Sequence, residues 1–104
     1  PYESFVVVFL DAKQRLLACD EMFKGTLTRA SVYPREVVMR ALQHGAHSIV
    51  LAHNHPSGDV HPSEADKAIT HNLRAALALI DISILDHVIV SAGQSLSMLG
   101  TGTF

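Results

Sequence analysis

The apolar residues of the chain fall into short runs separated by turn residues and small polar residues. Residues 5–10 form a continuous apolar run rich in β-branched side chains, which is typical of a buried strand. A turn at residues 11–13 and a second, longer strand from Leu16 onward complete a predicted hairpin. Three later runs also predict strands, namely 47–52, 82–90 and 95–99, with a turn at Ala92 and Gly93 before the last.

Two other segments repeat their apolar residues at helical spacing. The first helix is predicted to begin at Pro34, which the first turn tolerates, and Gly45 ends it as a left-handed cap. Ser63 and Asp66 form an S-x-x-D helix start, a variant of the capping box, for a second helix that runs to about Ile80. The predicted inner faces are Val37, Val38, Ala41 and Leu42 in the first helix, and Ala65, Ile69, Leu73, Ala76 and Ile80 in the second.

The order ββαβαββ predicts a fold of the α/β class, an α+β arrangement in which helices pack on a mixed sheet. The chain has 104 residues, of which 48% are hydrophobic. Two domains of half this length would each bury too little surface, so we expect one domain over residues 1–104.

Charge and cysteine content narrow the functional classes. The net charge is -2 and the eight Lys and Arg are scattered, so we expect no autonomous binding to nucleic acid. The single cysteine, Cys19, allows no intrachain disulfide, which fits a reducing, cytoplasmic setting. No apolar run of ~18 residues and no export signal occur, so no membrane association is expected. The chain opens at Pro1 without a methionine, and we expect it to be part of a longer protein.

The segment LAHNHPSGDVHPSEAD, residues 51–66, contains a candidate metal site. His53 and His55 follow a buried strand, and residues two apart in an extended segment point to the same side. Asp66 falls within the apolar arc of the second helix, where an ionised carboxylate is costly unless it is paired or binds a metal. Two histidines and one carboxylate leave a fourth zinc position open, as in catalytic zinc sites.

Simpler interpretations compete with this one. A lone histidine is usually exposed or hydrogen-bonded, and an aspartate in a first helical turn usually complements the helix dipole. The combination of His-x-His, a return loop and an inward-facing aspartate favours the metal site. Asp86-His87 is expected either to orient a metal ligand or to make a structural hydrogen bond. Four further histidines are expected on the surface, His61 in the loop and His44, His47 and His71 elsewhere.

The spacing from His53-Asn54-His55 to Ser63 and Asp66 resembles the JAMM motif of MPN-type metalloproteases. Together with RLLACDEMFKGTL, YPREVVMRAL and LDHVIV, it resembles the RadC family more closely, over nearly the whole chain. The resemblance implies a JAB/MPN, cytidine-deaminase-like fold and one zinc ion per chain held by His53, His55 and Asp66. It further implies that Ser63 polarises the substrate or stabilises a tetrahedral intermediate, a role that is compatible with a simple helix N-cap.

The resemblance also implies a glutamate general base at the start of an early strand. Glu3, immediately before SFVVVFL, and Glu21, after LLACD, are the two candidates, and Glu3 matches the strand position better. The helix-hairpin-helix-like region that precedes this domain in full-length RadC proteins is absent from the chain.

The predicted activity is zinc-dependent hydrolysis of a peptide or isopeptide bond in an unknown peptide or protein substrate. One alternative is a non-catalytic MPN-type interaction module, and another is the DNA-repair association that the RadC name carries. A nuclease is disfavoured because residues 50–66 contain no Lys or Arg to hold phosphate. Exposed sheet edges could support a homodimer or bind an extended peptide by strand addition.

Overall fold

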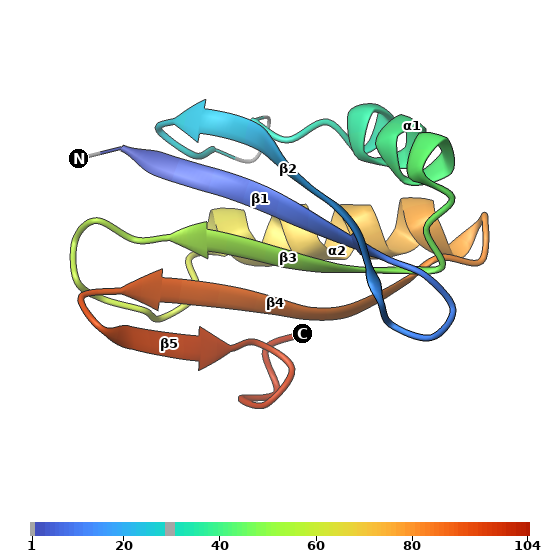
Figure 1. Cartoon of the computed structure of the whole chain (residues 1–104). Helices are drawn as coiled ribbons and strands as arrows, with labels where there is room; N and C mark the ends of the chain where they lie inside the picture. Colours follow the sequence, from blue (N-terminus) through green and yellow to red (C-terminus); the bar gives the residue numbers. More distant parts are fainter. Residues whose placement is uncertain (1, 29–30) are drawn as a thin grey trace.

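A computed structural model describes residues 2–28 and 31–104 of the protein. Within these residues the chain forms five strands and two helices, in the predicted order ββαβαββ (Figure 1). The elements are β1 (Glu3–Leu10), β2 (Leu16–Gly25), α1 (Pro34–His44), β3 (Ser48–Asn54), α2 (Glu64–Ala78), β4 (Ser83–Ser91) and β5 (Gln94–Ser97).

The five strands form one mixed sheet in the order β2-β1-β3-β4-β5 (Figure 1). Strands β3 and β4 are parallel and are connected through α2, whereas the other neighbouring pairs are antiparallel. A parallel pair needs a long crossover connection, which the 15-residue α2 supplies. The prediction of a mixed sheet with helices packed on it is therefore confirmed.

Both helices contribute to a single apolar core on one face of this sheet. Alternate residues of β1 point into the core, as the period of two in a strand requires. The fully buried apolar side chains are Phe5, Val7 and Phe9 of β1, Val37 and Ala41 of α1, Ile49 and Leu51 of β3, Leu73 and Leu77 of α2, Ile89 of β4 and Met98.

The predicted inner faces of the helices are wrong in part. Leu42 of α1 is 60% exposed, and α2 ends at Ala78, so that Ile80 lies beyond it. Along α2 the buried positions are Asp66, Ile69, Thr70, Leu73 and Leu77, while Ala65 and Ala76 are only partly buried. The buried face of α2 is therefore turned about the helix axis relative to the predicted face, so that it includes Asp66 and Thr70 in place of Ala65 and Ala76.

The predicted helix starts and turns are confirmed. Pro34 occupies the first turn of α1, and Gly45 caps its end with a left-handed φ of 68°. Ala92 and Gly93, with φ of 44° and 79°, form the two-residue connection between β4 and β5. Neither helix in the described part of the chain has both the length and the apolar character needed to span a membrane.

Candidate metal centre

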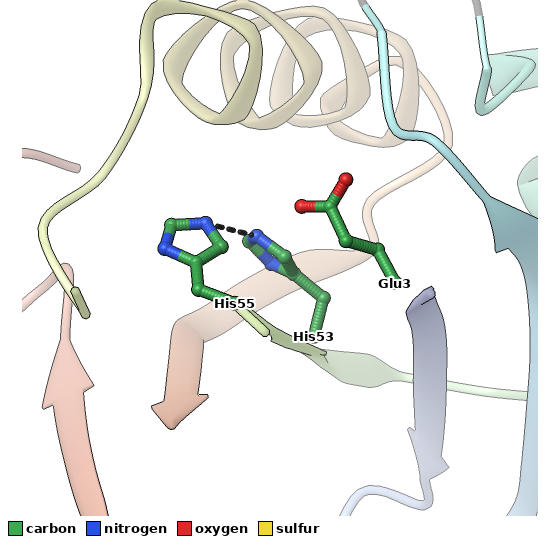
Figure 2. A group of neighbouring side chains, drawn as sticks. All are labelled: Glu3, His53 and His55. Carbon is green, nitrogen blue, oxygen red and sulfur yellow. Dashed lines mark hydrogen bonds between the residues drawn. The ribbon is translucent and has the colours of Figure 1, made fainter. Parts of the chain in front are cut away.

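His53 and His55 point to the same side at the end of β3 (Figure 2). Their Nε2 atoms lie 2.9 Å apart, and the Phe5 ring stacks on His53. The backbone of His55 is tied to β4, since its N–H donates to the Val90 carbonyl at 2.9 Å and its carbonyl accepts from the Ser91 hydroxyl. Both imidazoles are thus held by the sheet rather than by a free loop.

Asp66, in the first turn of α2, brings its carboxylate to both imidazoles. Its Oδ1 lies 2.9 Å from Nε2 of His53, and its Oδ2 lies 3.0 Å from Nε2 of His55. The side chain is 1% exposed. Burial on its own raises the pKa of Asp66, but hydrogen bonding to the carboxylate, including that from the Ser63 backbone N–H, lowers it more. The carboxyl pKa therefore lies well below its usual range, and the group is ionised at neutral pH.

The protonation of His55 indicates why a cation fits between these groups. Nδ1 of His55 lies 2.7 Å from the carbonyl oxygen of Asp59, which can only accept, so Nδ1 carries the proton. The Nε2 atom of a neutral His55 then directs a lone pair at the carboxylate. Oδ1 of Asp66 is also buried and has no hydrogen-bond partner of good geometry among the described residues. Imidazole nitrogens and a carboxylate are ligands that zinc accepts, so the residues fit this ion.

Glu3 approaches the same place from β1 (Figure 2). In the antiparallel pairing of β1 with β3, Phe5 lies opposite His53, so Glu3 extends this face toward His55. Candidate ligand atoms of Glu3, His53 and His55 all lie within 4.8 Å of one another. Asp66 contacts both imidazoles at about 3 Å and is the better-placed candidate ligand, whereas Glu3 borders the site and accepts a hydrogen bond from the Leu27 N–H at 2.8 Å.

Glu21, the other candidate base, lies on the opposite face of the sheet. It pairs with Val6, whose side chain points away from the core, and it accepts a hydrogen bond from the Ser4 hydroxyl at 2.5 Å. The structure therefore brings Glu3, and not Glu21, to the histidines. The role of Glu3 as a base stays a prediction.

Asn54, between the two histidines, was not predicted to contribute to the site. Its side chain points to the other side of β3 and accepts from the Ser4 N–H at 2.6 Å. It also donates to the Tyr2 carbonyl at 3.0 Å, so it binds the backbone on both sides of Glu3. The only sequence signal was its position in the His-x-His segment.

His87 and Thr70 lie directly behind His53. His87, on β4, is fully buried, and its Nε2 lies 2.8 Å from Nδ1 of His53. Its Nδ1 lies 2.5 Å from the hydroxyl of Thr70 on α2. Burial, with a smaller contribution from the neighbouring His53, lowers the pKa of His87 to about 3, so the ring is neutral.

Asp86 takes no part in this contact, since its carboxylate accepts hydrogen bonds from Ser97, Leu99 and the backbone of His87. In the pair Asp86-His87, His87 therefore contacts the predicted ligand His53, whereas Asp86 makes structural hydrogen bonds.

An open groove of about 520 Å³ leads to the site. Its lining includes Glu3, Leu27, His55, Asp59 and Ser63, and no Lys or Arg is among the described residues that line it. His61 also lies on this groove, but its side chain is 82% exposed and pairs with Asp59. The described part of the lining therefore carries carboxylates but neither Lys nor Arg.

The structure thus gathers His53, His55, Asp66, Ser63 and Glu3 in one place, at the end of the sheet where β3 leaves it. The other predicted surface histidines stay apart from it. His47 and His71 are exposed, and His44 is partly buried and contacts Asp20.

Comparison with known proteins gives a consistent result. Residues 1–103 match the model of the family described as RadC-like JAB domain. The chain is 64% identical over 102 residues to a protein of Variovorax paradoxus named UPF0758 protein, and 65% identical over 101 residues to one of Delftia acidovorans with the same name. These alignments cover 98% and 97% of this chain but 45% of each relative, so the chain spans less than half the length of these relatives.

Proposed function

This chain belongs to the family of RadC-like JAB domains, and we propose that it is a zinc-dependent hydrolase of peptide or isopeptide bonds. The observation that supports this most directly is the convergence of His53, His55 and Asp66, whose side chains meet within about 3 Å beside Glu3. The chain spans less than half the length of the relatives compared above, and the proposal concerns the chemistry of this domain alone.

His53, His55 and Asp66 would hold one zinc ion per chain. When bound, zinc supplies a Lewis acid that polarises a carbonyl oxygen and lowers the pKa of a water molecule toward ~7. The protein contributes rigid placement of the three ligands. Two come from the end of a central strand, and the third comes from a capped helix start.

Glu3 would act as the general base. Its carboxylate borders the histidines, lines the groove and can take a proton from a water molecule there. The Leu27 N–H, which donates to Oε2, and the Asn54 side chain, which binds the backbone on both sides of Glu3, restrict its movement.

Ser63 would stabilise negative charge that develops on the substrate carbonyl oxygen. Its Oγ accepts the Asp66 N–H, and its hydroxyl proton is donated to no other residue that the structure describes. Because Ser63 also lines the groove, this proton is available to a substrate oxygen. The helix cap therefore uses the Ser63 oxygen as an acceptor, and the catalytic role would use its hydroxyl proton as a donor.

The charge of the groove favours an amide substrate over a phosphodiester. Glu3 and Asp59 line it, and nucleic acid backbones are bound through Lys and Arg, which the described lining lacks. A peptide or isopeptide carbonyl is neutral and is not repelled. The substrate we propose is accordingly an exposed peptide segment or a branched peptide.

Two measurements test the proposal. Elemental analysis of the purified protein should give one zinc per chain, and a screen of peptides and lysine-branched isopeptides should find cleavage that zinc removal abolishes and zinc addition restores. A protein that binds no zinc, or a zinc-loaded protein that leaves both kinds of substrate intact, would contradict it.

A further inference from the structure

We propose that Thr70 and His87 are positioning residues that keep the proton of His53 on Nδ1, so that the lone pair of Nε2 faces Asp66. This inference rests on the proposed zinc site, because it concerns how one ligand is prepared to bind the metal. It follows from the number of protons that each group in a buried hydrogen-bond chain can donate.

The chain of hydrogen bonds starts at the backbone of α2. The Thr70 hydroxyl lies 2.7 Å from the carbonyl oxygen of Asp66, one turn earlier, and a carbonyl oxygen can only accept. The single hydroxyl proton is therefore donated to Asp66. Since Thr70 Oγ1 has no other proton, its 2.5 Å contact with Nδ1 of His87 requires that His87 donates.

The proton of His87 on Nδ1 determines the next bond. A neutral imidazole has one N–H, so Nε2 of His87 must accept. Its partner at 2.8 Å is Nδ1 of His53, which therefore carries the proton. His87 is 0% exposed and lies edge-on to the Phe5 ring, in surroundings where a second proton and its charge would be costly.

The opposite arrangement places the His53 proton on Nε2, directed at Asp66. Two acceptors are close, since Nε2 of His53 lies 2.9 Å from Oδ1 of Asp66 and 2.9 Å from Nε2 of His55. However, Oδ1 has no hydrogen-bond partner of good geometry among the described residues, so the short distance is not matched by alignment. The contact with Nε2 of His55 is aligned, but it joins two atoms that would bind one cation, and such atoms approach closely without a proton between them. The number of protons available from Thr70 and His87 therefore decides the position of the His53 proton.

The two histidines obtain their protonation in different ways. His55 donates Nδ1–H directly to the backbone carbonyl of Asp59, which can only accept. His53 donates to another imidazole, which could accept or donate depending on its own tautomer. Among the residues that the structure describes, the Thr70 hydroxyl alone fixes that choice, so His53 depends on a residue with which it shares no hydrogen bond.

The test compares Thr70→Val with Thr70→Ser. Valine has nearly the shape of threonine but no hydroxyl, so His87 loses its acceptor and can move its proton to Nε2. Zinc affinity, measured by competition with a chromophoric chelator, should fall about 10–100-fold, as is typical when a residue that orients a ligand is lost. Thr70→Ser keeps the hydroxyl and should bind zinc as the wild type does.

The second measurement reads the tautomers directly and needs no variant. In metal-free wild-type protein at pH 8, where free imidazole is neutral, ¹H–¹⁵N correlation spectra of the imidazole rings should place the protons of His53 and His87 on Nδ1. In Thr70→Val the His53 signal should shift toward the Nε2–H form. A wild-type His53 protonated on Nε2, or a folded Thr70→Val with unchanged zinc affinity and unchanged tautomers, would overturn the proposal.

The two measurements separate this inference from the proposed function. If the wild-type protein binds no zinc, the proposed hydrolase fails, while the metal-free spectra still decide the tautomer of His53. If the wild type binds zinc and the tautomer is the opposite one, the hydrolase stands and the role of Thr70 and His87 fails.

Discussion

Ser63 and Asp66 each accept a hydrogen bond from the backbone of the other. The Ser63 Oγ accepts the Asp66 N–H at 3.0 Å, and Oδ2 of Asp66 accepts the Ser63 N–H at 2.7 Å. This capping box defines the start of α2 and, at the same time, orients the carboxylate toward His53 and His55. Asp66 is therefore both part of the local signal for the helix start and a candidate metal ligand.

The first prediction concerns the two roles of Ser63. Ser63→Ala removes the N-cap acceptor and should lower the free energy of unfolding by about 1 kcal/mol, measured by urea denaturation. It should also lower turnover about 10²–10³-fold, as the loss of a donor to a developing oxyanion does. Zinc content should stay at the wild-type level, because the backbone N–H of residue 63 still binds Asp66.

Ser63→Thr is the matched control, since threonine also caps helices and keeps a hydroxyl. It should retain most of the stability. If Ser63→Ala loses stability but turns over substrate at the wild-type rate, Ser63 is an N-cap and nothing more.

The convergence of His53, His55 and Asp66 was predictable because the signals are local. His-x-His at the end of an apolar run and S-x-x-D at a helix start both depend on spacing within one element. The distance between the two elements is short along the chain, so few arrangements are possible. The loop of residues 55–63 returns the chain to the place where the strand ended.

The choice between Glu3 and Glu21 was not predictable in the same way. It depends on the register of β1 and β2, in which Phe5 pairs with Phe23 but the next residue, Val6, pairs with Glu21. Met22 is thus the extra residue of a bulge. Without this bulge Glu21 would pair with Val7, whose side chain points into the core, and would lie on the same face as the histidines.

Thr70 and His87 were missed, or left open, for a related reason. Their contact joins α2 to β4, and the contact of His87 with His53 depends on the parallel pairing of β3 with β4. That pairing has its own irregularity between Ile49 and Val50. The register between two paired strands cannot be deduced from the spacing of residues along one strand.

The second prediction concerns the ligand set. His53→Ala, His55→Ala and Asp66→Asn should each abolish stoichiometric zinc binding, measured by elemental analysis after dialysis. Asn keeps the size of Asp66 and an oxygen that can accept the Ser63 N–H, so this variant should remain folded. A variant with wild-type zinc content would remove its residue from the ligand set.

The third prediction concerns chelation. Removing the metal should abolish hydrolysis while the domain stays folded, because the apolar core that the sheet shares with α1 and α2 does not depend on the metal. A zinc finger, by contrast, is unfolded without metal. Far-UV circular dichroism with and without chelator should be nearly the same, with a modest decrease in melting temperature from the loss of a ligand of the native state. Complete loss of the signal would make the metal structural.

The fourth prediction concerns the general base. Glu3→Gln removes the charge but keeps the size of the side chain, so it should retain zinc and lower turnover about 10²–10⁴-fold. Glu21→Gln is the matched control on the opposite face of the sheet and should turn over nearly as the wild type does. The assignment must be reversed if Glu21→Gln is the inactive variant and Glu3→Gln the active one.

The fifth prediction concerns Asp86 and the pH dependence of stability. The Asp86 carboxylate accepts hydrogen bonds from the Ser97 hydroxyl, from the Leu99 N–H at 3.0 Å and from the His87 N–H at 2.7 Å. It therefore ties β4 to the end of β5. Burial raises the pKa of Asp86, but these hydrogen bonds outweigh burial, so the pKa of the folded state is lowered.

Because the pKa of Asp86 is lowered in the folded state, the stability of the protein should fall as the pH falls. The stabilisation is fully present above the unfolded value of about 3.9 and is lost as the pH falls through the folded pKa. Asp86→Ala should reduce the free energy of unfolding by about 1–3 kcal/mol at pH 7, measured by urea denaturation. Asp86→Asn keeps one acceptor oxygen and should lose less at pH 7. Because the wild-type carboxyl becomes protonated in acid, the difference in free energy of unfolding between the wild type and each variant should shrink below about pH 4. A difference that stays constant between pH 7 and pH 3 would show that the charge of Asp86 does not contribute to stability.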